Sequence, residues 1–169
     1  GAGGKSLHLA AVMKNKGKIL SLDIEDKKLF ELKKRAKRNG VSIIETRLID
    51  SSKVIKRLSE SADLVLLDVP CSGLGVLKRN PDAKWKLKKE RIEELIKTQE
   101  EILSLHSTMV KKGGTLVYVT CSILPSENEH QIKKFLSTRK DEFELIESKS
   151  ISPAESGFDG FFMAKLKKK

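Results

Sequence analysis

The stretch DLVLLDVPCSG at residues 63–73 decides the fold, together with its counterpart GTLVYVTCS at residues 114–122. Each begins with a short apolar run, rich in β-branched residues, that polar residues or glycine bound. Such a run is typical of a strand covered on both faces of a parallel sheet. Each run leads directly into a cysteine, Cys71 or Cys121. Because ligands bind at the carboxyl ends of strands in open α/β sheets, we expect both thiols at the functional edge.

The two cysteines also have simpler interpretations. Most free cysteines are small buried apolar residues, but such a thiol does not need the acid, the proline and the glycine that surround Cys71 in the run 68–73. A disulfide is disfavoured, because two cysteines in a chain with no secretory segment indicate a reducing compartment. We therefore predict a chemical role for at least one thiol and a cytoplasmic location.

Helical and strand patterns alternate along the rest of the chain. Strands are predicted at residues 18–22, 41–46, 63–67, 114–119, 143–146 and 161–166. Helices are predicted at residues 7–13, around Leu29, Leu32 and Ala36, at 54–58, from Ile92 to Val110 with a stop at Gly113 and Gly114, and after a capping box of Ser126 and Glu129. This alternation predicts an α/β fold, with a parallel sheet and helices on both faces.

Length and composition fit a single domain over residues 1–169. A chain of 169 residues with 38% hydrophobic content can bury a sizeable core. No apolar run is long enough to span a bilayer, so no membrane association is expected. The 34 Lys and Arg residues against 23 Asp and Glu leave a net charge of +11. This excess favours a polyanionic partner, although a merely solvated lysine-rich surface gives the same balance.

Four motifs, in order, resemble the RNA cytosine-5 methyltransferases of the Fmu/Sun and nucleolar-protein type. They are GAGGKS at residues 1–6, DVPCSG at 68–73 with RNPDAKW at 79–85, TCSILPSENE at 120–129, and DGFFMAKL at 159–166. The resemblance runs over nearly the whole chain. The NPDAKW run and the LPSEN run are most similar to those of bacterial enzymes that modify small-subunit ribosomal RNA.

This resemblance implies a Rossmann-like fold, S-adenosylmethionine as cofactor, and methyl transfer to carbon 5 of a cytosine in RNA, specifically ribosomal RNA, by a monomer. Since Gly1 already falls in the Gly-rich loop, we expect the sheet to lack its first central strand and the upstream RNA-binding region to be absent. A transfer RNA substrate and a noncatalytic RNA-binding fragment are the alternatives. A thiol-redox enzyme is disfavoured, because the two cysteines do not form a Cys-x-x-Cys motif.

The cofactor site that the resemblance implies begins with the Gly-rich loop, formed by Gly1, Ala2, Gly3, Gly4 and Lys5. The helix that follows this loop favours an anion at its start. Asp23 ends a predicted strand and can accept both ribose hydroxyls, or else it is an acid at the start of the next helix. Asp50 resembles the family's contact to the adenine amino group, with helix capping as the alternative.

The catalytic roles follow from motif matching. Cys121 is the nucleophile that adds to carbon 6 of the cytosine, and Cys71 assists elimination. Asp68 holds or protonates the ring at nitrogen 3 and belongs to the cofactor site as well, with a turn cap as the alternative. Lys5 either depresses a thiol pKa or contacts phosphate. The three histidines lack metal-ligand spacing, so no metal is expected.

A basic segment follows the first cysteine loop. Its Lys78, Arg79 and Lys84, with Trp85 among them, suit an RNA backbone and one stacked base. The alternative is a solvated helix start whose tryptophan packs into the core.

Overall fold

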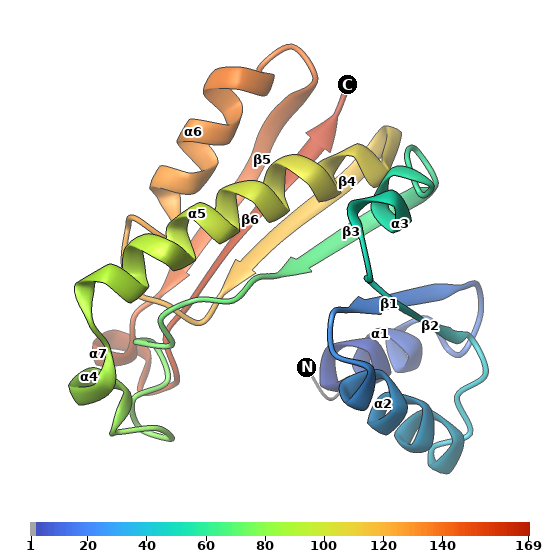
Figure 1. Ribbon diagram of the computed structural model, residues 1–169, viewed down its shortest axis with the longest axis horizontal. Coiled ribbons are helices and arrows are strands. Elements are labelled where there is room, and N and C mark those ends of the chain that lie inside the picture. The colour runs from blue at the N-terminus through green and yellow to red at the C-terminus, as the bar shows by residue number, and fades with distance from the viewer. Residues whose placement is uncertain (1–2) are drawn as a thin grey trace. The chain divides into compact units, whose positions relative to one another are not determined.

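The computed structural model describes residues 3–169, which divide into two compact units on either side of the bond between Ile55 and Lys56 (Figure 1). Helices and strands alternate in both units, so the predicted α/β class is confirmed. In the described part of the chain, no helix combines the length and the apolar character that crossing a bilayer requires. Each unit has its own sheet and is described by itself below.

The first unit contains a two-stranded parallel sheet. Its elements are α1 (Gly4–Val12), β1 (Ile19–Asp23), α2 (Asp26–Arg38) and β2 (Ile44–Leu48), and α3 (Ser52–Lys56) runs across the boundary to the second unit. Ile19 of β1 lies opposite Ile44 of β2. Helix α2 packs against both strands and buries Leu29, Leu32 and Ala36. These three residues form the apolar face that their spacing predicts.

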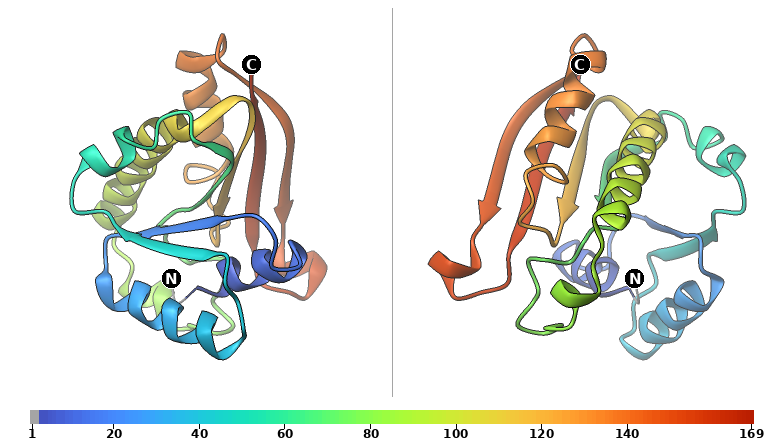
Figure 2. Two further views of the ribbon diagram at one scale, coloured as in Figure 1. Left: turned by 90° about the vertical axis from the view of Figure 1, so that its right-hand side faces the viewer. Right: turned by 60° about the vertical axis from the view of Figure 1, so that its left-hand side comes forward.

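The second unit contains a four-stranded sheet in the order β3–β4–β6–β5. Its elements are β3 (Ala62–Asp68), α4 (Ala83–Lys86), α5 (Lys89–His106), a 3-10 turn (Ser107–Met109), β4 (Val110–Thr120), α6 (Glu129–Arg139), β5 (Phe143–Ile151), α7 (Pro153–Ser156) and β6 (Phe161–Lys168). Figures 1 and 2 show α5 and α6 on the same face of this sheet, and the two helices contact each other.

The prediction of a parallel sheet holds for β3 and β4 but is wrong for the C-terminal strands. Strand β6 runs antiparallel to both of its neighbours, β4 and β5. The connection between β5 and β6 explains this direction. It spans residues 152–160 and contains only the four-residue helix α7, whereas a parallel crossover needs a dozen residues or more.

Aromatic rings fill the core of the second unit. Tyr118 of β4 and Phe162 of β6 are fully buried and meet edge to face, with ring centroids 6.4 Å apart. Phe135 of α6 packs against Phe143 of β5 at 5.3 Å. These contacts fix α6 on the sheet and fix β6 between its two neighbours.

The long helix of the second unit ends earlier than predicted. Helix α5 stops at His106, and Val110 already begins β4. Gly113 and Gly114 therefore lie inside a strand and do not stop a helix. Between the pairs Ala62–Val110 and Leu64–Thr115 the register of β3 and β4 shifts, and Gly113 has a φ of +72° there. The two glycines thus accommodate a bulge, a conformation that other residues adopt at a cost.

The predicted capping box before α6 is wrong. The N-cap residue is Asn128, and α6 begins at Glu129. The Glu129 carboxylate accepts a hydrogen bond from Ser150 Oγ at 2.8 Å instead of returning to the backbone of Ser126. The chain enters the helix through a turn in which the amide of Asn128 bonds to the carbonyl of Pro125.

Candidate active site

The two cysteines lie in loops that follow neighbouring parallel strands. Strand β3 ends at Asp68, which lies opposite Val119 of β4. Three residues beyond the β3 end and one residue beyond the β4 end, the chain reaches Cys71 and Cys121. Their Sγ atoms are 3.2 Å apart and share a hydrogen bond, and both cysteines are half-buried and in the thiol form, not joined in a disulfide. The structure thus brings together two thiols that lie 50 residues apart in the sequence.

The surroundings of Cys71 favour the protonated form of its thiol. The hydrogen bond to Cys121, and then burial, raise the pKa of the Cys71 thiol well above its ordinary value. Cys71 therefore keeps its proton at neutral pH and can donate it in a hydrogen bond to the Cys121 sulfur. A sulfur that accepts such a bond is stabilised as a thiolate, which is the nucleophilic form of cysteine.

A buried carboxylate, not assigned a role from the sequence, holds the loop of Cys71. Glu127 lies in the turn before α6 and is fully buried. It accepts hydrogen bonds from the Ser72 amide at 2.8 Å and from Ser72 Oγ at 2.5 Å. Gln99 Nε2 of α5 donates to the same carboxylate at 3.0 Å and to the Pro70 carbonyl at 2.9 Å. These hydrogen bonds converge on one buried side chain, so they fix the residues on both sides of Cys71.

The loop of Cys121 is tied to the same turn. Ser122 Oγ lies 3.0 Å from Ser72 Oγ, which links the two cysteine loops directly. Asn128 Nδ2 donates to the Ser122 carbonyl at 3.0 Å, and Thr120 Oγ1 donates to Asn128 Oδ1 at 2.6 Å. The position of each thiol is thus set by polar side chains that are themselves buried.

A backbone contact joins a third loop to these two. The Gly75 amide donates to the Cys121 carbonyl at 2.9 Å, and the Gly160 amide donates to the Gly75 carbonyl at 2.7 Å. A Cβ atom on Gly75 would lie 2.2 Å from the Gly160 oxygen and 2.7 Å from the Cys121 oxygen. Only glycine allows three backbones to approach this closely.

The other residues assigned from the sequence divide between the units. Asp68 ends β3 in the second unit and is exposed. Gly3, Gly4 and Lys5 lie in the first unit at the start of α1. Gly3 has a φ of +85°, and a Cβ atom there would meet Leu32 at 2.3 Å. Gly1 and Ala2 lie outside the described residues.

Two carboxylates of the first unit lie at, or just beyond, the ends of its parallel strands. Asp23 is the last residue of β1, and its Oδ1 accepts a hydrogen bond from the Glu25 amide at 2.9 Å. Since Glu25 is the N-cap of α2, Asp23 precedes the helix and does not cap it. Asp50 follows β2 and accepts a bond from Ser51 Oγ at 2.9 Å, not from an amide of α3. Both carboxylates thus lie at the carboxyl end of the two-stranded sheet.

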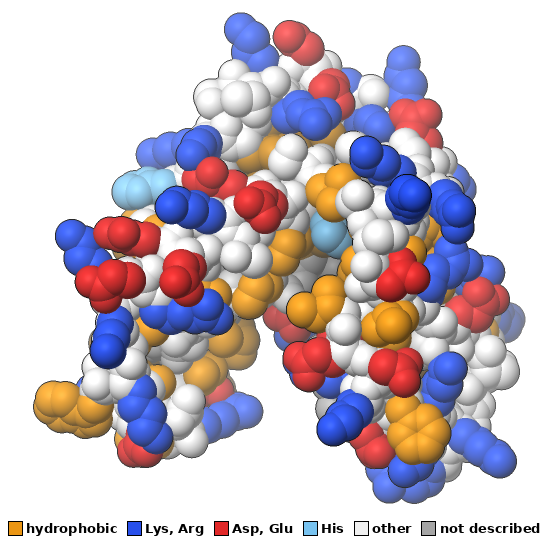
Figure 3. Space-filling view, viewed as in Figure 1, with side chains coloured by type: hydrophobic (Ala, Val, Ile, Leu, Met, Phe, Trp, Pro, Cys, Tyr) orange, Lys and Arg blue, Asp and Glu red, His pale blue; other side chains and the backbone are white. Residues whose placement is uncertain are grey.

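The basic segment after Cys71 is solvent-exposed. Trp85 is 81% exposed, so the alternative that it packs into the core is wrong. Lys84 Nζ lies 4.8 Å from the centroid of its ring, and Arg79 forms an ion pair of 2.8 Å with the buried Asp159. Lys78 is exposed as well. On the face shown in Figure 3, Lys and Arg side chains are interspersed with Asp and Glu.

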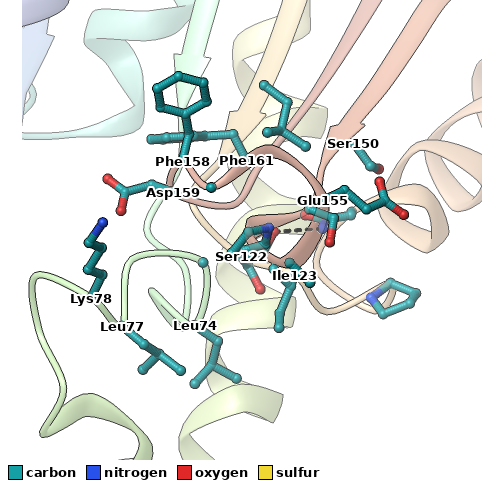
Figure 4. Close-up of a pocket in the computed structure, with 18 of the residues that line it drawn as sticks. Leu74, Leu77, Lys78, Ser122, Ile123, Ser150, Glu155, Phe158, Asp159 and Phe161 are labelled. Atoms are coloured by element: carbon teal, nitrogen blue, oxygen red, sulfur yellow. Dashed lines mark hydrogen bonds between the residues drawn. The ribbon is translucent and has the colours of Figure 1, made fainter.

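A cavity of about 880 Å³ lies beside the cysteine loops in the second unit. It is formed by the loop at residues 74–78, the segment at 122–129 and the segment at 150–161. In Figure 4, Phe158 and Phe161 lie on one side of it, and Leu74 and Leu77 on the other. Its size falls within the range of pockets that bind small ligands.

This architecture is that of the Rossmann-like methyltransferases. The crystal structure of a methyltransferase homolog protein from Pyrococcus horikoshii superposes with a TM-score of 0.84 at 27% identity and covers 98% of this chain and 58% of that one. NSun6 from Pyrococcus horikoshii, solved with SFG, superposes with a TM-score of 0.87 at 29% identity, over 98% of this chain and 45% of that one.

The sequence comparisons define a narrower group than the fold does. The family model of the 16S rRNA methyltransferases RsmB/F matches residues 1–167. A Bacillus subtilis (strain 168) protein named probable ribosomal RNA small subunit methyltransferase B is 38% identical over 99% of this chain. The chain therefore belongs to the RsmB/F family. It spans 41% of the length of that relative.

Proposed function

We propose that this chain carries the catalytic residues of an S-adenosylmethionine-dependent RNA methyltransferase. It methylates carbon 5 of a cytosine in ribosomal RNA through a covalent adduct with Cys121. Membership of the RsmB/F family supports the reaction class and the substrate class. The observation that carries the mechanism is the contact between Cys121 and a Cys71 thiol that hydrogen bonding, and then burial, keep protonated.

The residues of the first unit suit the cofactor. Gly3 leads into α1, whose first amides suit the carboxylate of the cofactor. Asp23 and Asp50, at the carboxyl ends of parallel strands, suit ribose hydroxyls and an adenine amino group. Gly1, Ala2, Gly4 and Lys5 complete the proposed loop. Asp68 is kept as a residue that the family resemblance assigns to the cofactor. When bound, S-adenosylmethionine supplies a methyl group on a sulfonium, ready for transfer to a carbon nucleophile.

The chain's own residues make that carbon nucleophilic. The Cys121 thiolate forms a bond to carbon 6, and the electron pair of the C5–C6 double bond moves to carbon 5. Asp68 holds the ring at nitrogen 3 and its amino group, which stabilises the added charge. After methyl transfer, a base removes the proton from carbon 5 and the S–C6 bond breaks. Cys71 assists this step by donating a hydrogen bond to the departing sulfur.

Binding of the RNA strand is assigned to the exposed basic segment. Lys78, Arg79 and Lys84 suit phosphate, and the exposed face of Trp85 suits stacking on an unpaired base. For Lys5 both alternatives stay open: its positive charge lowers the pKa of a thiol, or it contacts a phosphate group.

The proposal is tested by a denaturing gel of cysteine variants with a cytosine-containing RNA and S-adenosylmethionine. We expect Cys121→Ala to form no covalent protein–RNA species and no methylated product. We expect Cys71→Ala to accumulate a denaturant-resistant adduct, because addition proceeds and elimination stalls. The assay uses the chain alone and the chain joined to the parts of the Bacillus subtilis relative that lie outside the matched region. An adduct with Cys121→Ala but not with Cys71→Ala reverses the two roles, and efficient turnover by both variants refutes the covalent mechanism.

A further inference from the structure

The cavity beside the cysteine loops begins one residue after Cys121. Its wall includes Ser122 and Ile123, and the Cys121 carbonyl is bonded to Gly75 in the same wall. Neither thiol lines the cavity itself. It is therefore a space next to the proposed reaction site, on the same chain segment, rather than the site of bond formation.

Two large apolar side chains of the cavity lining are exposed to solvent, and one of them is an aromatic ring. Phe158 is 76% exposed and Ile123 is 49% exposed, and both belong to the lining (Figure 4). Large apolar side chains at the mouth of a cavity favour a ligand with an apolar face of its own. A nucleobase has such a face, and unpaired bases of RNA stack on exposed aromatic rings.

Two of the four charged side chains that line the cavity already have partners within the protein. Asp159 is paired with Arg79, and Glu129 accepts a hydrogen bond from Ser150. The side chains of the other two charged lining residues, Glu155 and Lys78, form no hydrogen bond or ion pair with the described part of the chain. One carboxylate and one ammonium group thus remain for a ligand that carries both donors and a negative charge.

We propose that this cavity binds an unstacked guanine in the same RNA strand as the target cytosine. Phe158 stacks on the base, Glu155 accepts its hydrogen bonds and Lys78 contacts its phosphate. The inference rests on the proposed function, since it names a nucleotide beside the cytosine of that reaction.

The chemistry of the free carboxylate selects guanine. Guanine presents two adjacent donors, N1–H and the N2 amino group, which a carboxylate accepts in a bidentate arrangement. The Watson–Crick edges of adenine and cytosine place an acceptor beside one donor, and that of uracil places carbonyl oxygens beside its N–H. Each of these three bases brings a lone pair against the Glu155 carboxylate.

The test is the binding of short single-stranded RNAs to the 169-residue chain, measured by fluorescence anisotropy at fixed salt. The RNAs carry one cytosine next to guanosine, inosine, adenosine or an abasic site. Inosine lacks only the 2-amino group, so we expect it to bind about tenfold more weakly than guanosine, the effect of one hydrogen bond to a charged acceptor. Glu155→Gln should remove this difference, and Phe158→Ala should weaken every base toward the abasic level. The matched controls are Glu144→Gln and Phe30→Ala, outside the cavity.

Equal binding of guanosine and inosine overturns the inference, as does a preference that survives Glu155→Gln. Photocrosslinking with 6-thioguanosine beside the cytosine gives a second measurement, and crosslinks to residues outside 74–78, 122–129 and 150–161 also overturn it. The cysteine-variant gel with the same RNAs separates the two proposals. A Glu155-dependent preference without any adduct refutes the methyl-transfer mechanism alone, and an adduct without the preference refutes the guanine site alone.

Discussion

Cys71 keeps its proton because its neighbours disfavour a second negative charge. The Cys121 sulfur lies 3.2 Å away, and partial burial removes some of the water that stabilises a thiolate. In a pair of thiols this close, one ionises first and makes ionisation of the other harder. The proposed mechanism accordingly gives the two cysteines different roles, one as the nucleophile and one as a hydrogen-bond donor.

This division predicts the pH dependence of alkylation. With iodoacetamide and mass spectrometry of each peptide, the Cys71 rate in the native chain should reach half of its plateau at a higher pH than in the urea-unfolded chain, where the thiol titrates near its ordinary 9.0. Cys121→Ala removes the hydrogen bond, which is the largest cause of the raised pKa, so the midpoint should move down in that variant. A native Cys71 midpoint at or below that of the unfolded chain would contradict the assignment.

At the level of single residues, the sequence predicts one part of the candidate site and misses another. The pairing of the two cysteine loops follows from strand ends, which short apolar runs reveal. The role of Glu127 does not follow, because its hydrogen bonds join residues 28 and 55 positions away. A glutamate on a turn is normally solvated, and nothing in its spacing shows that it is buried.

Among the connecting elements, the loop around Gly75 has the least room for change. It is bonded on one side to the Cys121 loop and on the other to the segment that leads into β6. The three segments come from distant parts of the sequence, and they meet without any side chain at position 75. The geometry of the cysteine pair therefore depends on a backbone contact.

Gly75→Ala should destabilise the chain by about 1–3 kcal/mol, because the new Cβ atom forces backbones apart. Urea unfolding followed by circular dichroism measures this free energy. Gly4→Ala is the control, since a Cβ atom there meets nothing within 4 Å, and its effect should stay below about 1 kcal/mol. Equal stability of Gly75→Ala and the parent chain would show that the loop can move aside.

At the level of helices and strands, the sequence predicts what local periodicity encodes. The apolar face of α2 and the strands before both cysteines are examples. The direction of β6 and the end of α5 were predicted wrongly, because they depend on the short β5–β6 connection and on the bulge at Gly113. Both are features of how strands meet, and no periodicity records them.

The two units differ in the size of their cores. The first unit buries mainly small and aliphatic side chains, such as Ala10, Leu29 and Leu32, around two strands. The second unit buries large aromatic side chains, such as Tyr118 and Phe162, in a four-stranded sheet that two helices cover. Two strands are marginal by themselves, whereas a sheet of three or more strands packed against helices has independent stability.

We therefore expect residues 56–169 alone to fold and residues 1–55 alone to remain largely unfolded. Circular dichroism should show a cooperative thermal transition for residues 56–169 and none for residues 1–55. The intact chain is the reference for the amplitude of that transition. A cooperative transition of residues 1–55 by themselves would show that the two-stranded unit needs no partner.

The exposure of Trp85 has an optical consequence. It is the single tryptophan of the chain, so emission excited at the red edge of its absorption comes from this position and no other. A ring that is 81% exposed emits at long wavelength and is open to collisional quenchers. A base that covers the ring would change both properties. The chain thus carries an intrinsic reporter on the segment between Lys78 and α5, and occupancy there is readable without any label.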